Sequence, residues 1–179
     1  MLAATAALAL AQNGARAFDE STALFQAIAE VNNLPSDDLP SDEVQTRRLE
    51  PREWAAVFPV IAQLRPHLDA AQFLDRVRRQ SHGGYELVGA YRNGRLIGLL
   101  GMRPVHTLVR GPHLHVDDIV IEESERRAGG GRALMAYAEA DARARGMTAV
   151  FLDARPEAIG FYQAIGYELH TTPSMKKIL

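Results

Sequence analysis

The residues best placed to do chemistry in this sequence form a glycine-rich turn. Residues 125–135 read ERRAGGGRALM, so two arginines and three consecutive glycines lead directly into a segment with helical character. The first N–H groups of a helix have no intrahelical partner, and glycines in front of them leave these groups open to a ligand. The partial positive charge of a helix N-terminus favours an anion such as phosphate. The turn therefore predicts an anion site, to which Arg126, Arg127 and Arg132 can add charge-assisted hydrogen bonds.

Two common nucleotide-binding motifs fit this turn poorly. A P-loop ends in Gly-Lys followed by Ser or Thr, whereas Gly131 is followed by Arg132 and Ala133. The dinucleotide-binding fingerprint opens a parallel βαβ unit near the start of its domain, whereas this turn lies late in the chain. A nucleotide-binding enzyme therefore stays open as a weaker hypothesis, and so does a glycine turn that binds no ligand.

A second group of reactive residue types precedes the turn. His113, His115, Asp117 and Asp118 are candidates for a general base. Strand alternation would place Asp118 on the face opposite the other three. Such groups on a strand are more often structural than catalytic. A metal site is the weakest reading, because His-x-His comes with no further ligand motif, and we expect no metal.

The apolar pattern before these residues predicts one strand and two helical segments. Residues 44–49 should form a strand, and Pro51 suits the first turn of a helix. Pro59 should kink or restart that helix. Asp69 is suited to cap the next helix, and a glycine pair at 83–84 should end it.

Turn signals then predict antiparallel strands. Asn93-Gly94 accepts the positive φ angles of a tight hairpin, and Arg110-Gly111 predicts a second antiparallel pair. After the glycine turn we expect a helix that ends at Gly146, a buried strand at 148–154 and a short helix at 157–165. Residues 167–172 and 175–179 could add short strands. The fold class is therefore α/β of the α+β type, with a mixed, mostly antiparallel central sheet flanked by helices and one parallel crossover.

Composition limits the possible functions. The chain has 179 residues, 47% of them hydrophobic, and a net charge of -2, which fits a globular protein and gives no reason to expect nucleic acid as a partner. The absence of cysteine excludes disulfides, thiolate metal ligands and a cysteine nucleophile, and a cytoplasmic location fits it. The apolar run near the N-terminus is too short to span a membrane, so we expect no membrane partner. We expect a helical N-terminal extension and linker at 1–43 and a compact domain at 44–179.

Three motifs in order resemble the GNAT superfamily of acetyl-CoA-dependent N-acetyltransferases. Arg126-Arg127-Ala128-Gly129-Gly130-Gly131 matches the family's Arg/Gln-x-x-Gly-x-Gly/Ala motif. It is preceded by the strand sequence HVDDIVI and followed by AIGFYQAIGY at residues 158–167, similar to the late family motif with a Phe-Tyr pair. The resemblance covers residues 46–179 and implies a GNAT acetyltransferase domain, with acetyl-CoA as co-substrate and a small-molecule or protein amine as acceptor.

The resemblance also implies which residues bind the co-substrate. In the family the coenzyme's pyrophosphate lies on the amides of the glycine turn, and the pantetheine arm pairs with the preceding strand where it splays from its parallel neighbour, often at a bulge. One amide of that strand can also stabilise the oxyanion. The cofactor-binding residues implied here are Ile119, Val120, Ile121, Arg126, Arg127, Ala128, Gly129, Gly130, Gly131, Arg132 and Ala133.

Tyr162 matches the family's general acid, although an aromatic residue on a helix can equally be a packing residue. Its hydroxyl is protonated at neutral pH and can protonate the leaving thiolate. Because the chain has no cysteine, transfer should be direct, through a ternary complex. One departure is that Arg155-Pro156-Glu157 replaces the asparagine that many members carry in this loop. The alternative function is a non-catalytic acyl-CoA-binding sensor or interaction module. The sequence leaves open whether the chain forms a homodimer, as is common in the family.

Overall fold

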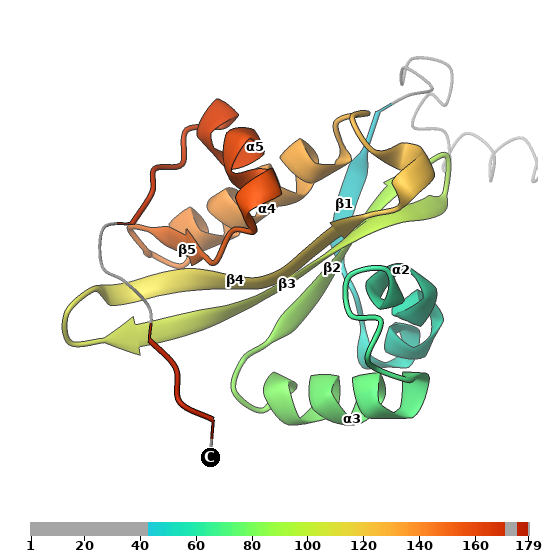
Figure 1. Cartoon of the computed structure of the whole chain (residues 1–179), viewed down its shortest axis with the longest axis horizontal. Coiled ribbons are helices and arrows are strands. Elements are labelled where there is room, and N and C mark those ends of the chain that lie inside the picture. The colour runs from blue at the N-terminus through green and yellow to red at the C-terminus, as the bar shows by residue number, and fades with distance from the viewer. Residues whose placement is uncertain (1–42, 171–174, 179) are drawn as a thin grey trace, which may run out of the picture. The chain divides into compact units, whose positions relative to one another are not determined.

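The computed structural model describes residues 43–170 and 175–178 (Figure 1). The predicted helical extension lies outside the described residues, apart from Glu43 at its end. The five strands form one sheet in chain order. They are β1 (Gln45–Arg48), β2 (Glu86–Arg92), β3 (Arg95–Thr107), β4 (Gly111–Ile121) and β5 (Val150–Leu152). The first four are antiparallel to their neighbours and β5 is parallel to β4, which confirms the predicted mixed sheet and crossover.

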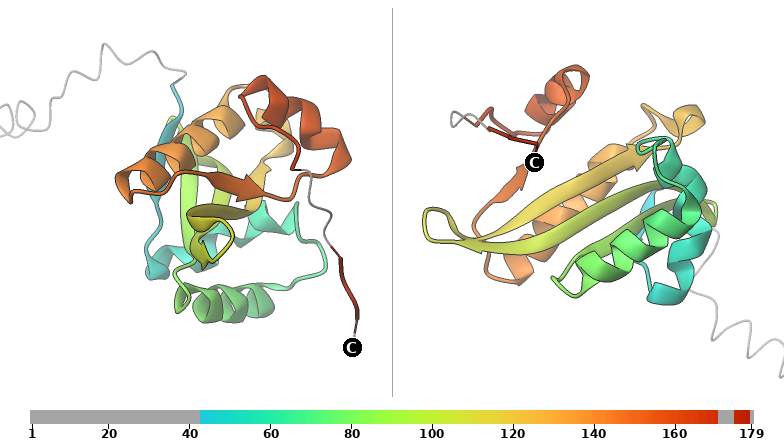
Figure 2. Two further views of the ribbon diagram at one scale, coloured as in Figure 1. Left: turned by 90° about the vertical axis from the view of Figure 1, so that its left-hand side faces the viewer. Right: turned by 60° about the horizontal axis from the view of Figure 1, so that its bottom comes forward.

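Helices cover both faces of this sheet. The helical segments are η1 (Pro51–Val57), α2 (Phe58–Ala62), α3 (Ala70–Ser81), η2 (Glu123–Glu125), α4 (Gly130–Ala144), η3 (Pro156–Ala158) and α5 (Ile159–Ala164). Helices α4 and α5 lie on one side of the sheet and α2 and α3 on the other (Figures 1 and 2). None of the helices in the described part of the chain has the length and apolar character that a membrane span requires.

Each face has its own apolar core. Leu100, Met102 and Leu114 of the sheet pack with Leu134 and Met135 of α4, and all five are almost fully buried. On the other face the sheet packs against the first helical segments. That cluster includes Leu87, Leu99, Val120, Trp54, Val57, Ile61, Phe73 and Val77. The two clusters hold the sheet between α4 and the α2–α3 layer, so the middle of β4 has a fixed position.

The local signals in the sequence formed as predicted. Asn93 and Gly94 have φ angles of 50° and 73°, as the hairpin between β2 and β3 requires. The Asp69 side chain accepts a hydrogen bond from the Gln72 N–H at 2.8 Å and caps α3. Pro59 lies in the first turn of α2, where the chain changes from 3-10 to α geometry.

A bulge in β4 overturns the expected side-chain directions. Gly101 pairs with Asp118 but Met102 pairs with Val116, so Asp117 is an extra residue in the strand. Because β3 continues its alternation, the partners of Gly101 and Arg103, which are Asp118 and His115, lie on the same face. The prediction that Asp118 faces away from His115 is therefore wrong, since simple alternation does not hold across a bulge.

The predicted C-terminal strands are also wrong within the described residues. No strand is present at 167–170 or 175–178, and residues 171–172 and 179 lie outside the described part. The Tyr167 N–H instead donates to the Tyr162 carbonyl at 3.0 Å, which closes α5. Strand β5 has only three residues and is half-buried, where a buried strand at 148–154 was expected. Because β5 is this short, it pairs with β4 at only three positions.

Candidate active site

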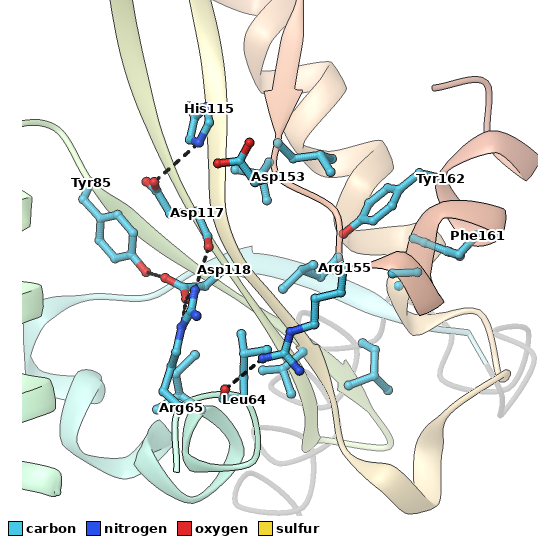
Figure 3. Close-up of a pocket in the computed structure, with 18 of the residues that line it drawn as sticks. Leu64, Arg65, Tyr85, His115, Asp117, Asp118, Asp153, Arg155, Phe161 and Tyr162 are labelled. Carbon is cyan, nitrogen blue, oxygen red and sulfur yellow. Dashed lines mark hydrogen bonds and ion pairs between the residues drawn. The ribbon is translucent and has the colours of Figure 1, made fainter. Parts of the chain in front are cut away.

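A cavity of about 1090 Å³ collects most of the predicted site residues (Figure 3). It lies between the α2–α3 segment, the second half of β4, the glycine turn and the loop from β5 to α5. The predicted residues that line it are Ile119, Val120, Ile121, Arg126, Arg127, Gly129, Gly131, Arg132 and Tyr162. Ala128, Gly130 and Ala133 are not among the lining residues. A second hollow of about 1270 Å³ beside β5 contains no residue of the glycine turn.

The second half of β4 has an open edge. Strand β5 pairs with β4 only at residues 114–116, before the bulge, and no other strand in the described chain pairs with that edge. The Glu122 N–H donates to the Ile97 carbonyl at 2.9 Å, so Val120, two residues earlier, also turns its backbone groups toward β3. The backbone groups of Ile119 and Ile121 therefore point to the open edge. An extended ligand can pair with them as a strand would.

The glycine turn leaves the first amides of α4 unbonded. Gly129 is the N-cap, with a φ of 86°, and no side chain caps the helix. Within the described residues no hydrogen bond engages the N–H groups of Gly130, Gly131 and Arg132, as expected for the start of a helix. The Ala133 N–H donates to the Gly129 carbonyl at 3.0 Å, so this amide is already used within the protein. The donors available to an anion are thus those of Gly130, Gly131 and Arg132.

Ion pairs hold the turn against the sheet. Arg92 of β2 pairs with Glu125 at 2.7 Å and also donates to the Ala128 carbonyl. Arg95 of β3 pairs with Glu122 at 3.1 Å and with Glu125. These contacts fix the backbone just before α4. The turn is therefore organised before any ligand binds, which lowers the entropic cost of binding.

Tyr162 directs its hydroxyl into this cavity (Figure 3). Its ring is buried, 7% exposed, and packs edge-on against Phe161 and Tyr167 at centroid distances of 5.1 and 6.0 Å. Burial raises the pKa of the Tyr162 hydroxyl above its ordinary value, because the charged phenolate is poorly solvated there. The group therefore stays protonated at neutral pH and can act as a proton donor.

The predicted base candidates separate into different environments. His113 is buried and packs edge-on against Phe151, outside the cavity. Asp117 pairs with Arg103 at 2.8 Å and lies 3.7 Å from His115. Because Arg103 already neutralises Asp117, this carboxylate is poorly suited to take a proton from a substrate.

Asp118, like Asp117, is held by contacts within the protein. It pairs with Arg65 at 2.7 Å and accepts a hydrogen bond from the Tyr85 hydroxyl at 2.9 Å. Burial, followed by the Asp118 charge, raises the pKa of Tyr85 well above its ordinary value. Gly101 makes room for this hydroxyl, since a Cβ there would lie 1.9 Å from it. Asp118 and Tyr85 thus form a structural wall of the cavity.

Several lining residues were not among the predicted site residues. Arg65 and Arg76 come from the α2–α3 segment, and Asp153 and Arg155 follow β5. The Arg155 Nη2 donates to the Leu64 carbonyl at 3.3 Å and so reaches across the cavity (Figure 3). The available signal was a charged residue, Asp153, near the end of the otherwise apolar segment 148–154. Within the described residues no group of three or more histidine or acidic side chains is arranged to hold a metal ion.

Comparisons with known proteins agree with this geometry. The model of the acetyltransferase (GNAT) family matches residues 45–167. The uncharacterized N-acetyltransferase YhdJ of Bacillus subtilis is 33% identical over 117 residues, which is 62% of this chain and 80% of YhdJ. The glucosamine 6-phosphate N-acetyltransferase of Trypanosoma brucei brucei is 30% identical over 79 residues, 43% of this chain and 54% of that protein.

The fold matches that of a solved acetyltransferase. The aminoglycoside N-acetyltransferase AAC(6')-Iy, in complex with CoA, aligns with a TM-score of 0.67 at 19% identity. The alignment covers 76% of this chain and 95% of that one. The glycine turn, the open edge of β4 and the buried tyrosine all lie within the residues that the family model matches. The chain therefore belongs to the GNAT family and is an N-acetyltransferase that uses acetyl-CoA.

Proposed function

We propose that this enzyme transfers the acetyl group directly from acetyl-CoA to an amine, with both substrates bound in the cavity beside β4. The observation that carries this proposal is that the open edge of β4, the unbonded amides of Gly131 and Arg132, and Tyr162 all border one cavity of about 1090 Å³. A cavity of this size can hold the reacting ends of two substrates.

In the proposed complex the protein holds acetyl-CoA at two places. The N–H groups of Gly130, Gly131 and Arg132 bind the pyrophosphate, and the nearby arginines add charge to that site. The backbone groups of Ile119 and Ile121 pair with the amides of the pantetheine arm. These contacts place the thioester near the bulge at Asp117, on the side of Tyr162.

The reaction forms a bond between the amine nitrogen and the acetyl carbon and breaks the bond from that carbon to sulfur. Tyr162 donates its hydroxyl proton to the leaving sulfur, so that coenzyme A departs as a thiol. The amine loses one proton to solvent, from which Tyr162 recovers its own. Since the chain has no cysteine, a cysteine-bound acetyl intermediate has no place in this scheme.

Thermal unfolding with acetyl-CoA, desulfo-CoA and ATP tests the binding half of this proposal. Ligand at about 100 times its dissociation constant should stabilise the fold by about 2.7 kcal/mol, which raises Tm by a few degrees. We expect this shift with both CoA compounds and not with ATP. No change in Tm at millimolar acetyl-CoA would contradict the proposal. A rise in Tm with ATP alone would favour a nucleotide-binding enzyme.

Thiol release with a panel of amines tests the catalytic half. Initial rates over a grid of both substrate concentrations should give intersecting double-reciprocal lines, as a ternary complex requires. Parallel lines would instead indicate an acetylated enzyme. Saturable acetyl-CoA binding without thiol release on any amine would favour a non-catalytic acyl-CoA-binding module.

A further inference from the structure

In the part of the cavity away from the glycine turn, some charged side chains have no oppositely charged partner among the described residues. Arginines outnumber acids among the lining residues. The lining arginines are Arg65, Arg76, Arg126, Arg127, Arg132 and Arg155, and the lining acids are Asp117, Asp118 and Asp153. Three of these arginines belong to the glycine turn and its helix. The remaining charges determine which acceptor the cavity can receive.

Two of the three acids are already neutralised by the protein. Arg65 pairs with Asp118 at 2.7 Å, and Arg103 pairs with Asp117 at 2.8 Å through two hydrogen bonds. Arg65 also donates to the Asp117 carbonyl at 3.1 Å, which fixes its direction. These pairs offer a substrate little net charge. The carboxylates of Asp117 and Asp118 are therefore poorly suited to bind a cationic acceptor.

Arg155 and Arg76 have no such partner. Within residues 43–170 no carboxylate lies within ion-pair distance of either guanidinium. Arg155 bends across the cavity, and its guanidinium donates a hydrogen bond to the uncharged Leu64 carbonyl at 3.3 Å (Figure 3). The Arg155 guanidinium points toward the α2–α3 loop. It is therefore separate from the arginines of the glycine turn, which would bind the pyrophosphate. A planar guanidinium in this position is suited to bind a carboxylate or a phosphate.

Asp153 is the one lining acid without an ion-pair partner in the described part of the chain. It follows β5 directly, and its carboxylate points toward His115 and Asp117 (Figure 3). An amine group held there would lie near the bulge at Asp117, where the proposed complex places the thioester. The acceptor region therefore has one unmatched negative position and two unmatched positive ones.

We infer that the acceptor is a primary amine that also bears an anionic group, either a carboxylate or a phosphate. Asp153 holds the amine end, and Arg155, assisted by Arg76, holds the anion. This inference rests on the proposed acetyl transfer and names its substrate class. The overall reaction is that of the proposed function: a nitrogen–carbon bond forms, a carbon–sulfur bond breaks and the amine releases one proton.

Matched acceptor pairs test the substrate class. Alanine is compared with alaninamide for the carboxylate, and glucosamine 6-phosphate with glucosamine for the phosphate, with spermidine as a polycation. We expect kcat/KM to be at least about tenfold higher for the anionic member of one pair, and that pair identifies the anion. Neutral amines or spermidine performing equally well or better would overturn the inference.

The panel extends to other amino acids and aminoalkyl phosphates, so that it samples both anions broadly. If acetyl-CoA stabilises the protein but no anionic amine is acetylated, the inference is wrong while the co-substrate site stands. If acetyl-CoA does not stabilise the protein, the proposed function fails first. These two failures are therefore distinguishable.

The variant Arg155→Gln tests the position of the anion. It should raise the KM for the anionic acceptor at least about tenfold, with little change in the KM for acetyl-CoA or in rates with the neutral analogue. Arg155→Lys should recover part of the loss. Arg79→Gln is the matched control, because Arg79 lies on α3, is exposed and, within the described residues, pairs only with Asp75. A rise confined to the KM for acetyl-CoA would assign Arg155 to the co-substrate and overturn the inference.

Discussion

Replacing Tyr162 by phenylalanine should lower kcat by about a hundred- to ten-thousandfold, the usual contribution of a general acid. The ring still fills its place against Phe161 and Tyr167, so the fold should be retained. The KM for acetyl-CoA should change little, because only the hydroxyl is lost. Thiol release measures the rate, and the thermal shift with acetyl-CoA confirms that binding is intact.

Tyr167→Phe is the control for this variant. Tyr167 is half-buried in the same aromatic cluster but does not line the cavity, so its variant should keep most of the activity. The pH dependence gives a second check. Because burial raises the pKa of Tyr162, its hydroxyl stays protonated above neutral pH. Ionisation of Tyr162 should therefore not lower kcat at any pH below about 10. Full turnover by Tyr162→Phe would show that another group protonates the thiolate.

Gly129→Ala should raise the dissociation constant of CoA by about ten- to a hundredfold. Gly129 has a φ of 86°, where an L-residue is strained, and its Cβ would enter open space beside the amides that bind the pyrophosphate. The variant therefore adds strain to the turn and places a methyl group at the anion site. Calorimetric titration with CoA measures the affinity.

Gly111→Ala separates strain from the effect on the ligand. Gly111 lies in the β3–β4 hairpin, with a φ of 67° and no atom within 4 Å of an added Cβ, and it does not line the cavity. Both variants should lose about 1–2 kcal/mol of stability, but only Gly129→Ala should weaken CoA binding. Equal CoA affinity in the two variants would mean that the turn does not contact the coenzyme.

Local patterns in the sequence predicted several elements of the fold correctly. The Asn93-Gly94 hairpin, the Asp69 cap and the glycine turn formed as predicted because a few neighbouring residues determine each of them. The family motifs then predicted which residues face the co-substrate. Those that line the cavity include Arg127, Gly131 and Tyr162.

Features that depend on contacts between distant segments were not predictable. The bulge at Asp117 appears only in the pairing of β4 with β3, and it reverses the expected direction of Asp118. The pairing of Asp118 with Arg65 joins residues 53 positions apart, and that of Arg155 with Leu64 joins residues 91 apart. Alternation along one strand contains no information about such contacts.

Amide chemical shifts during a titration with CoA test most directly whether the coenzyme lies on the glycine turn and the open edge of β4. We expect the largest changes at the N–H groups of Gly130, Gly131, Arg132, Ile119 and Ile121, because these donors have no hydrogen-bond partner among the residues that the structure describes. Changes that leave those amides unmoved and gather around the second hollow beside β5, at Leu169 and His170, would contradict the proposed binding site.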